Sequence, residues 1–508
     1  MPDRYADVRL DADARAAEPD ARPLAERPFT LALLGDFSGR GDAAPRPDLA
    51  GLRPLGVDRD DFDAVLARLA PQLRLRPDGA AQPPDVSFRD LDDFHPDQLF
   101  ARLPLFQELR LLRRRLADPA SFRQAAAELT PPAEPTAPAP AATTTTLSGG
   151  ELLELMLGEA PPAVPPAPAA AEAADLRAYV RRLVAPHRVA GPEPGQAELL
   201  ARLDAALGEQ MRALLHHPAF QALEALWRAT FLLVRRVETG PSLRIYLLDV
   251  TRAELQADLA PGRELHESAL YRLLVEAARE TPGGTPWSLL AGDYRFGPAE
   301  DDLRLLGRLA ELAERAGAPF LAAAAPELIG CPSFAALPEP AGWAEPDAAW
   351  QALRREPAAR WLGLAAPRLL LRLPYGEDAE PCESFRFEEL PGPPRHDDYL
   401  WGSPAFACAL LLAQSFAAAG WAMRPGMLRE IERLPLHLAR DADGDTRAQP
   451  CAETLLTERA AQRILDAGVM PLASRKEQDA VHLVRFQSVA SPPAALAGPW
   501  TRPRSVEA

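Results

Sequence analysis

The stretch from Trp287 to Gly330 most constrains the fold of this chain. An apolar run, Ser288 to Ala291, precedes a segment whose leucines recur at helical spacing, at positions 303, 305, 306, 309 and 312. Gly317 is placed to end that helix as a C′ glycine, with a proline close behind it. Phe320 to Ala325 is apolar throughout, as in a strand buried on both faces. This order predicts a βαβ crossover, and therefore a parallel sheet covered by helices.

The bulk composition limits the function classes. A chain of 508 residues is long enough for two or three domains with sizeable cores. Its formal net charge of −16 argues against nucleic acid as the main partner. The first residues contain no apolar signal segment. The longest apolar candidate, Ala405 to Ala419, is shorter than a membrane span and includes Gln414 and Ser415. We therefore expect a cytoplasmic protein without membrane insertion.

The cysteines and the catalytic motifs point away from an enzyme. The four cysteines are far apart and form no CxxC pair, at positions 331, 382, 408 and 451. This pattern predicts a reducing compartment and no structural zinc site. A Walker A loop, GxSxG, HExxH and a dinucleotide fingerprint are all absent from the sequence. We therefore predict no catalytic, cofactor-binding or metal-binding residues and no cofactor; a soluble enzyme whose site is assembled in space is the rival hypothesis.

Composition divides the chain into five parts. Residues 1–27 are polar and predict a flexible N-terminal arm, and residues 28–129 predict a first globular region. Residues 130–194 are rich in Pro, Ala and Thr and predict an extended linker. Residues 195–490 predict a second globular region, and residues 491–508 a disordered tail. The predicted fold class is α/β, with mixed sheets and covering helices in two globular regions joined by the linker.

Local patterns place further elements along the chain. Thr251 and Glu254 have the spacing of a capping box and predict the start of a helix, and Pro218 predicts a joint in the helical stretch 197–237. Other predicted helices cover 61–75, a stretch from Pro96, 268–280, 404–419 and 453–467. Predicted strands are one from Phe29, then 86–88, 243–249, 435–438, 469–472 and 481–489.

A short amphipathic segment interrupts the linker at residues 147–159, LSGGELLELMLGE. Ser148 and Glu151 are spaced as a capping box. The apolar residues that follow are Leu152, Leu153, Leu155, Met156 and Leu157. The pattern fits a helix that docks in a partner's groove, and equally a helix that packs back on its own domain.

Longer segments of the sequence resemble the contractile sheath of type VI secretion systems. The stretch PFTLALLGDFSGR (28–40), with the two segments after it, resembles the small sheath subunit (TssB, also VipA). The second region resembles the large subunit (TssC, also VipB). The segments that carry this resemblance include LLHHPAFQALEALWR (214–228), TPGGTPWSLLAGDYRFG (281–297), APFLAAAAPELIG (318–330) and DDYLWGSPAFACALLLAQSFAAAGW (397–421).

The resemblance implies a structural function. In this family, small and large subunits pair, assemble around an inner tube and contract to eject it. The implied partners are other sheath subunits or further copies of this chain, an inner-tube protein and a baseplate. A Clp-type AAA+ unfoldase recycles the contracted sheath through a short helix near the start of the large subunit. The position of residues 147–159 makes Leu152, Leu153, Leu155, Met156 and Leu157 candidates for that docking helix.

One departure leaves an alternative function open. The family's large subunit continues beyond the segment that residues 453–489 resemble, whereas this chain ends at Ala508. The resemblance therefore suggests a C-terminally shortened subunit. The alternative is a non-polymerising, sheath-like adaptor or terminator that pairs with sheath or baseplate components.

Overall fold

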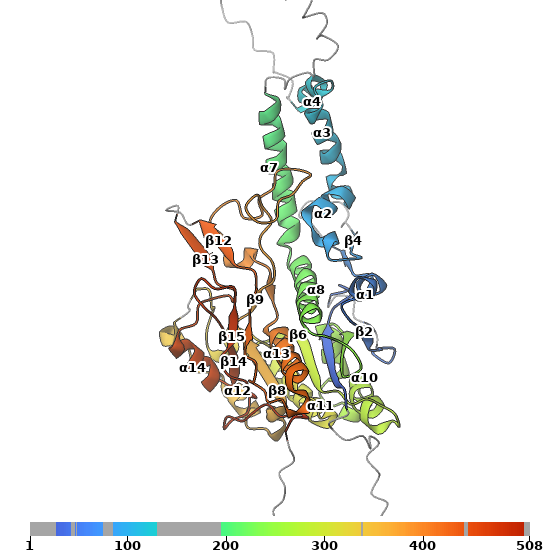
Figure 1. The fold of residues 1–508 in the computed structure, drawn as a ribbon, viewed down its shortest axis with the longest axis vertical. Helices are drawn as coiled ribbons and strands as arrows, with labels where there is room; N and C mark the ends of the chain where they lie inside the picture. The colour runs from blue at the N-terminus through green and yellow to red at the C-terminus, as the bar shows by residue number, and fades with distance from the viewer. Residues whose placement is uncertain are drawn as a thin grey trace, which may run out of the picture. The chain divides into compact units, whose positions relative to one another are not determined.

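The computed structural model describes residues 27–41, 46, 48–74, 85–129, 195–336, 339–440 and 445–501 (Figure 1). The chain divides into two compact units. The first comprises residues 1–106 and 207–508, and the second residues 107–206. Most of the predicted N-terminal arm and the whole predicted linker, including residues 147–159, lie outside the described residues.

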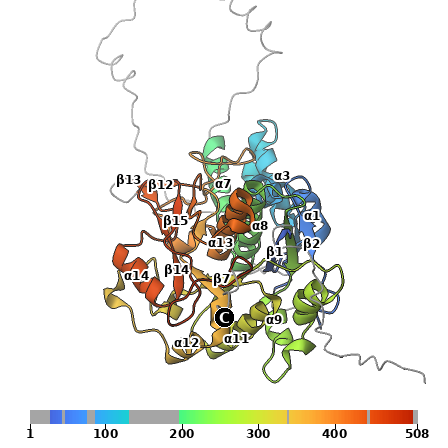
Figure 2. The same cartoon turned by 60° about the horizontal axis from the view of Figure 1, so that its bottom comes forward.

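A nine-stranded mixed sheet organises the first unit (Figure 2). Its order is β11-β15-β14-β8-β7-β6-β1-β5-β2. The strands from β14 to β5 in this order are parallel, and β2, β11 and β15 pair antiparallel with their neighbours. The bounds are β1 (Phe29–Gly35), β2 (Leu55–Val57), β5 (Leu243–Asp249), β6 (Leu289–Phe296), β7 (Phe320–Ala324), β8 (Leu362–Ala366), β11 (Glu430–Ile431), β14 (Val469–Ser474) and β15 (Val481–Leu483). The predicted α/β class is confirmed.

The βαβ crossover predicted from the sequence is confirmed. Strands β6 and β7 are parallel neighbours, and α11 (Glu300–Ala316) connects them. Gly317 follows the helix at φ 66°, a left-handed conformation that glycine adopts without a Cβ clash. All five residues of β7 are buried, which accounts for its unbroken apolar sequence.

The two regions distinguished by composition share this sheet. Strand β1 comes from the first region but lies between β5 and β6 of the second. It pairs in parallel register with both, from Phe29 opposite Leu243 to Gly35 opposite Asp249 on one side. Every residue of β1 is buried. A strand that is apolar on both faces needs a position inside a sheet, and the second region provides one.

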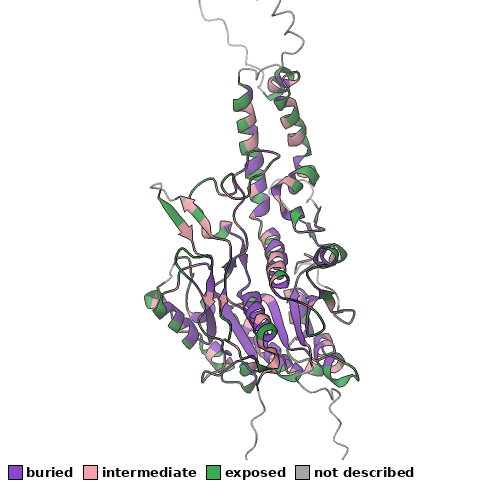
Figure 3. Cartoon of the chain, in the orientation of Figure 1, coloured by how far each residue is buried: buried purple, intermediate pink, exposed green. Residues whose placement is uncertain are grey.

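Helices cover both faces of the sheet. On one face, α13 (Pro404–Ala419) packs across β1, β6, β7 and β8 and against α8 (Pro218–Arg236). On the other face, α11 packs in one hydrophobic core with alternate residues of the strands, among them Ala32, Leu34 and Leu290. Figure 3 shows the strands of the sheet mostly in the buried colour.

The helix at Pro404–Ala422 has the length and apolar composition of a membrane span. In the structure, 61% of that window is buried inside the protein. Its contacts with four strands make it a core helix of the sheet.

The remaining elements are short or lie at the edges of the sheet. The other helices are α1 (Phe62–Leu69), α2 (Pro96–Arg102), α3 (Gln107–Ala117), α4 (Phe122–Leu129), α7 (Gln196–Leu215), α9 (Arg252–Asp258), α10 (Ala269–Tyr271), α12 (Ala348–Leu353) and α14 (Glu458–Asp466), with the π-helix η6 (Arg272–Glu280). Short 3-10 turns are η2 (Asp92–Phe94), η3 (Pro104–Phe106), η5 (Leu265–Glu267), η7 (Pro326–Ile329), η8 (Pro340–Gly342), η9 (Pro357–Trp361), η10 (His396–Asp398) and η11 (Gly420–Ala422). Three two-stranded sheets pair β3 (Gln72–Arg74) with β4 (Asp85–Ser87), β9 (Leu369–Leu370) with β10 (Trp401–Gly402), and β12 (His437–Arg440) with β13 (Thr446–Gln449).

Residues 491–501 differ from the sequence expectation of a disordered tail. Leu496 is 1% exposed, and the N–H of Ala497 donates a hydrogen bond to the carbonyl of Arg360. The expectation of a disordered tail was therefore wrong for this segment, because the proline-rich composition outweighed the apolar residue Leu496, which is buried. Residues 502–508 lie outside the described residues.

The second unit contains α3, α4 and the beginning of α7. Within it, the side-chain amide of Gln196 donates to the carbonyl of Leu116 at 2.7 Å. Arg113 donates to Asp204 at 2.7 Å, which ties α3 to α7. These bonds join helices from the two sides of the predicted linker.

Candidate functional site

The junction between the two sequence regions is the candidate functional site. We define the junction as β1, the loop after it up to Arg46, and the parts of β5, β6 and α9 that they contact. Strand β1 supplies the hydrogen bonds that close the middle of the sheet, and the side chains of Leu31 and Leu33 are fully buried. Burying an apolar side chain of this size contributes roughly 1.5–3 kcal/mol.

Thr30 fixes the register of β1 against β6. Its backbone N–H donates to the hydroxyl of Ser288 at 3.0 Å, and its own hydroxyl donates to the carbonyl of Pro286 at 2.6 Å. The N–H of Ser288 returns a bond to the Thr30 carbonyl at 2.8 Å. A buried hydroxyl is costly unless it is paired, so these bonds specify one alignment of the two strands.

Charged groups join the two regions at the carboxyl ends of β1 and β5. Arg40 forms ion pairs with Asp249 and Glu254, whose side chains are 7% and 0% exposed. Arg46 contacts Asp249 at 2.7 Å, and its backbone N–H donates to Glu254 at 2.7 Å. Glu254 also accepts the N–H of Thr251 in the capping box that begins α9. Two carboxylates from the second region are thus neutralised by two arginines from the first.

Asp36 shapes the loop that presents Arg40. Its carboxylate accepts the N–H groups of Arg40 at 3.1 Å and Gly41 at 2.7 Å. Burial raises the pKa of Asp36 above its usual value, with a further contribution from the nearby Asp249 charge. The loop is therefore held by its own carboxylate, and the guanidinium of Arg40 is placed between the two acidic groups.

The side chain of Trp227, in α8, packs against the junction. Its indole N–H donates to the carbonyl of Phe37 at 3.0 Å, and its ring packs edge-on against Phe37 and Phe62. The side chain is fully buried. Aromatic pairs of this geometry contribute about 0.5–1.5 kcal/mol beyond the area that they bury.

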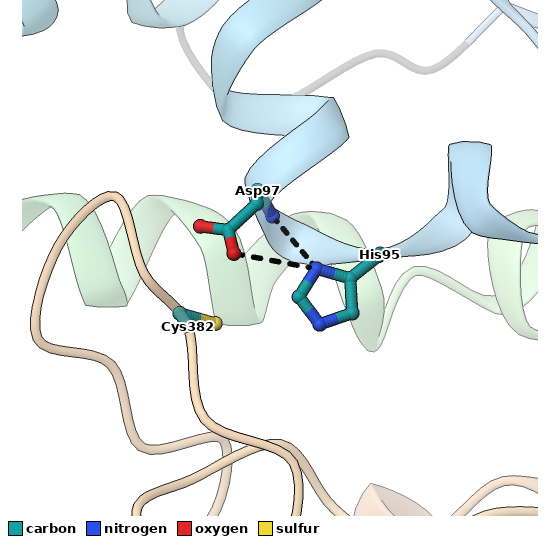
Figure 4. A group of neighbouring side chains, drawn as sticks. All are labelled: His95, Asp97 and Cys382. Atoms are coloured by element: carbon teal, nitrogen blue, oxygen red, sulfur yellow. Dashed lines mark hydrogen bonds and ion pairs between the residues drawn. The ribbon is translucent and has the colours of Figure 1, made fainter.

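A second contact between the regions lies at the start of α2 (Figure 4). The carboxylate of Asp97 accepts the backbone N–H groups of Glu383 and Ser384, both at 2.9 Å. Burial alone would raise the pKa of Asp97, but these bonds lower it below its usual value. Cys382 lies beside this contact, and burial together with the Asp97 charge raises the pKa of its thiol to about 12. Among the described residues, His95, Asp97 and Cys382 form a group of potential metal ligands.

The second region contains a buried ionic network centred on Arg372. Its guanidinium contacts Glu224 at 2.8 Å and Glu389 at 2.7 Å, and it stacks on the ring of Tyr375. Burial would raise the pKa of Glu389, but Arg372 and a hydrogen bond from His216 lower it to about 2. The network holds the loop before α13 against α8. The charges of Arg372, Glu224 and Glu389 are paired with one another, as expected for a structural device.

A cavity of about 680 Å³ opens at the carboxyl ends of β6 and β7. Its lining includes Asp293, Arg295, Arg368 and Asp398. Burial raises the pKa of Asp293 to about 6, although a hydrogen bond with Ser403 and the charge of Arg368 act in the opposite direction. Arg368 is itself bound by Glu453 at 2.6 Å. The mixed charges of the lining favour no single class of ligand.

The site residues predicted from sequence are not tested by this geometry. Leu152, Leu153, Leu155, Met156 and Leu157 lie outside the described residues. The junction was not predicted from the sequence. Arg40 and Glu254 are 214 positions apart, and local patterns do not show contacts between residues so distant in the chain. The available signal was the largely apolar character of residues 29–35, in which Thr30 is the one polar side chain; such a run is unusual for an edge strand.

Comparisons with known proteins assign both regions to one secretion apparatus. Residues 197–490 match the family VipB, described as EvpB/VC_A0108, tail sheath N-terminal domain. Residues 6–129 match the family described as type VI secretion system, VipA, VC_A0107 or Hcp2. A relative from Pseudomonas aeruginosa, the type VI secretion system sheath protein TssC1, is 33% identical over 304 residues. The match covers 58% of this chain and 61% of the relative, so the chain spans less than two thirds of that protein.

These matches agree with the two sequence regions and with the resemblance of their segments. The VipB match covers more than half of the chain, and the VipA match covers the region that supplies β1. The chain therefore belongs to the type VI secretion sheath family, and it carries VipA-type and VipB-type parts fused in one polypeptide.

Proposed function

We propose that this sheath protein assembles in the cytoplasm around an inner tube and that contraction of the assembly ejects the tube. The proposed action is mechanical and requires no enzymatic step. Its partners are further copies of the chain or other sheath subunits, the inner-tube protein and the baseplate.

The observation that carries this proposal is the junction. One chain supplies both the small-subunit strand β1 and the large-subunit strands β5 and β6 on either side of it. A protomer that must transmit force between neighbours needs its two halves joined by main-chain hydrogen bonds and a buried core. Both are present across β1.

Electron microscopy of the purified chain tests the proposal. The chain is imaged in negative stain alone and with its cognate inner-tube protein, in a buffer where the tube protein assembles. We expect tubes or stacked rings whose length increases with the concentration of the chain. Monomers or small oligomers under the same conditions would contradict the proposal and favour the non-polymerising adaptor or terminator.

A mixing experiment separates these two functions further. When the chain is added at a low ratio to a growing sheath of separate small and large subunits, a true subunit is incorporated and lengthens the polymer. A terminator shortens it. The length distribution is measured at several ratios, with heat-unfolded chain as the control.

We further propose that residues 147–159 dock a Clp-type AAA+ unfoldase that disassembles the contracted sheath. The support is the position of this segment just before the VipB-type region and its five clustered apolar residues.

A further inference from the structure

Three side chains that commonly bind metals meet where α2 contacts the loop at residues 376–390 (Figure 4). They are His95, Asp97 and Cys382, and one ligand atom from each lies within 4.8 Å of the other two. His95 and Asp97 come from the VipA-type region, and Cys382 comes from the VipB-type region. All three are partly exposed, so an ion in solution can reach them.

Asp97 is held ready to act as a ligand. Each of its carboxylate oxygens accepts one backbone N–H from the loop, from Ser384 at Oδ1 and Glu383 at Oδ2, both at 2.9 Å. The two carboxylate oxygens have four lone-pair positions, so the backbone bonds and the side-chain bond from Ser384 still leave one for a cation. The loop that carries Cys382 is fixed against Asp97 by the same two bonds.

The Nδ1 atom of His95 lies close to the carboxylate of Asp97. This nitrogen is 3.7 Å from Oδ2 of Asp97 and accepts the N–H of Asp97 at 3.2 Å, which caps α2. The imidazole ring packs edge-on against Tyr375, at 4.9 Å between centroids. Its orientation is therefore set by packing and by a long hydrogen bond that is easily replaced.

We propose that His95 Nδ1, Asp97 Oδ2 and Cys382 Sγ form a binding site for Zn²⁺. A thiolate, an imidazole and a carboxylate are the donor set that zinc prefers, with water available as the fourth ligand. The proposal concerns the stability of the folded chain, and it holds whether or not the chain polymerises.

The required movement is small. Zinc bonds are about 2.0–2.3 Å long, so ligand atoms in a tetrahedral site are roughly 3.3–3.8 Å apart. The ligand atoms of the three residues are now up to 4.8 Å apart. Rotations of the Cys382 and His95 side chains that move Sγ and Nδ1 by about 1 Å bring these separations into that range.

The proton balance of binding is simple. Zn²⁺ replaces the proton of the Cys382 thiol, so one proton is released and the thiolate sulfur bonds to the metal. At His95, the metal replaces the N–H of Asp97 as the partner of Nδ1, and the proton of the neutral ring stays on Nε2. Zinc binding therefore breaks one capping hydrogen bond of α2 and forms bonds between the ion and its three protein ligands.

The surrounding charge favours a cation. The loop from Gly376 to Leu390 contains one arginine and six acidic residues, which are Glu377, Asp378, Glu380, Glu383, Glu388 and Glu389. Arg386 is paired with Glu377 at 3.0 Å, and Glu389 is paired with Arg372 at 2.7 Å. The remaining excess of negative charge attracts a divalent cation toward the site.

A metal at this position would link the two regions at a second place, outside the sheet. Cys382 is far from His95 and Asp97 in the sequence. Its neighbour Glu383, which is hydrogen-bonded to Asp97, is 286 positions from that residue. Closing so long a separation with an additional bond stabilises the folded state by restricting the unfolded chain.

Cobalt substitution tests the site with a spectroscopic signature. The full chain, stripped with a chelator, is titrated with CoCl₂ and the absorption spectrum is recorded. We expect one equivalent of Co²⁺ to give a thiolate-to-cobalt charge-transfer band in the near ultraviolet and intense tetrahedral bands in the visible. ZnCl₂ added to the cobalt form should abolish both bands. ZnCl₂ added to the metal-free chain should release one proton and raise the thermal midpoint of the chain.

Two variants test Cys382 and His95 as ligands, and a third is the control. Cys382→Ser removes the thiolate and should abolish the charge-transfer band. His95→Asn keeps a residue that caps helices well but removes the imidazole; it should weaken binding by more than about a hundredfold, because loss of even an outer-shell partner costs roughly 10- to 100-fold. Cys408→Ala, in the buried core helix α13, should leave the spectrum unchanged.

The variants are compared without metal first, and each should match the circular dichroism of the parent chain. A pale octahedral spectrum without the charge-transfer band would overturn the proposal. So would a band that survives in Cys382→Ser, or binding that His95→Asn leaves unchanged. These results do not depend on tube formation, so they are separate from the test of the proposed function.

Discussion

Arg40 donates two hydrogen bonds from Nη2 to the carboxylate of Glu254, at 3.1 and 2.8 Å, across 214 positions of sequence. Glu254 is at the same time the residue that completes the capping box of α9. One carboxylate therefore serves both the start of a local helix and the attachment of the VipA-type region. This double role makes the pair a sensitive point of the junction.

Replacing Arg40 with alanine should destabilise the chain by about 2–3 kcal/mol, because breaking a buried ion pair leaves an uncompensated charge. Asp249 and Glu254 would remain at 7% and 0% exposure with Arg46 as their remaining arginine. The free energy of unfolding is measured in urea. The matched control is Arg304→Ala, which removes exposed pairs with Glu300 and Asp301 and should cost less than about 0.5 kcal/mol. Equal losses in the two variants would contradict this role for Arg40.

The two regions should stay together after the chain is cut between them. A specific protease site is inserted between Ala142 and Thr143, and the cleaved protein is examined by size-exclusion chromatography. We expect the two fragments to co-elute, because β1 remains paired with β5 and β6.

A charge in β1 should separate these fragments. Leu33→Asp places a carboxylate at a fully buried position, whereas Leu438→Asp changes a side chain that is 62% exposed. Fragments with Leu33→Asp should elute apart, and fragments with Leu438→Asp should still co-elute. Separation of the unmodified fragments would show that the covalent connection is required.

Asp293 should make the chain less stable as the pH rises. Burial raises its pKa from 3.8 to about 6, so its contribution is most favourable below pH 4 and is lost as the pH rises through 6. Asp293→Asn stays neutral, so we expect it to be more stable than the parent at pH 8, by roughly 3 kcal/mol at most. Urea unfolding at pH 4 and pH 8 measures this difference. A gain of the same size at both pH values would contradict the titration of Asp293.

Glu389 should act in the opposite direction at acid pH. Its pKa is lowered from 4.5 to about 2, so its stabilising effect is present above pH 4.5 and is lost as the pH falls toward 2. Glu389→Gln should destabilise the chain at pH 7 and reduce the loss of stability between pH 4.5 and 2. Glu314→Gln, on the exposed side of α11, is the control and should leave the acid profile unchanged. Parallel profiles for the parent and Glu389→Gln would refute the assignment.

The docking proposed for residues 147–159 is tested by binding. Leu153→Asp with Met156→Asp places two charges among the five apolar residues at 152–157 and should abolish capture of the chain by an immobilised Clp-type unfoldase. Thr144→Asp adds a charge to the same linker outside the apolar cluster and should leave capture intact. Capture of the double variant at the parent level would rule out this segment as the docking element.

Local elements of the fold were predictable because their signals are local. Thr251 and Glu254 predicted a capping box, and the structure contains both of its hydrogen bonds. The predicted joint at Pro218 separates α7 from α8. Pattern and capping chemistry determine such features within a few residues.

Extended segments were predicted less well. The strand expected at 481–489 ends at Leu483. Val484 still donates to the carbonyl of Pro471 in β14, but Val489 donates to that of Leu362 in β8, so the chain leaves β14 within the expected strand. An apolar extended pattern records burial, and it does not specify which neighbour supplies the hydrogen bonds.

The long-range arrangements were beyond local patterns. The place of β1 between β5 and β6 depends on partners more than 200 positions away, as the bond from Thr30 to Pro286 shows. Likewise, cysteine spacing cannot show that Cys382 lies beside His95 and Asp97. Only the folded chain brings these residues together.

The central position of β1 also has a consequence for synthesis on the ribosome. Phe29 is translated 214 residues before its partner Leu243, and at about 5–20 residues per second this corresponds to a delay of roughly 10–40 s. During that time the most apolar strand of the first region has no sheet to enter. The strand that is made first is thus among the last to be placed, and the nascent chain must keep it from pairing with other chains until β5 and β6 emerge.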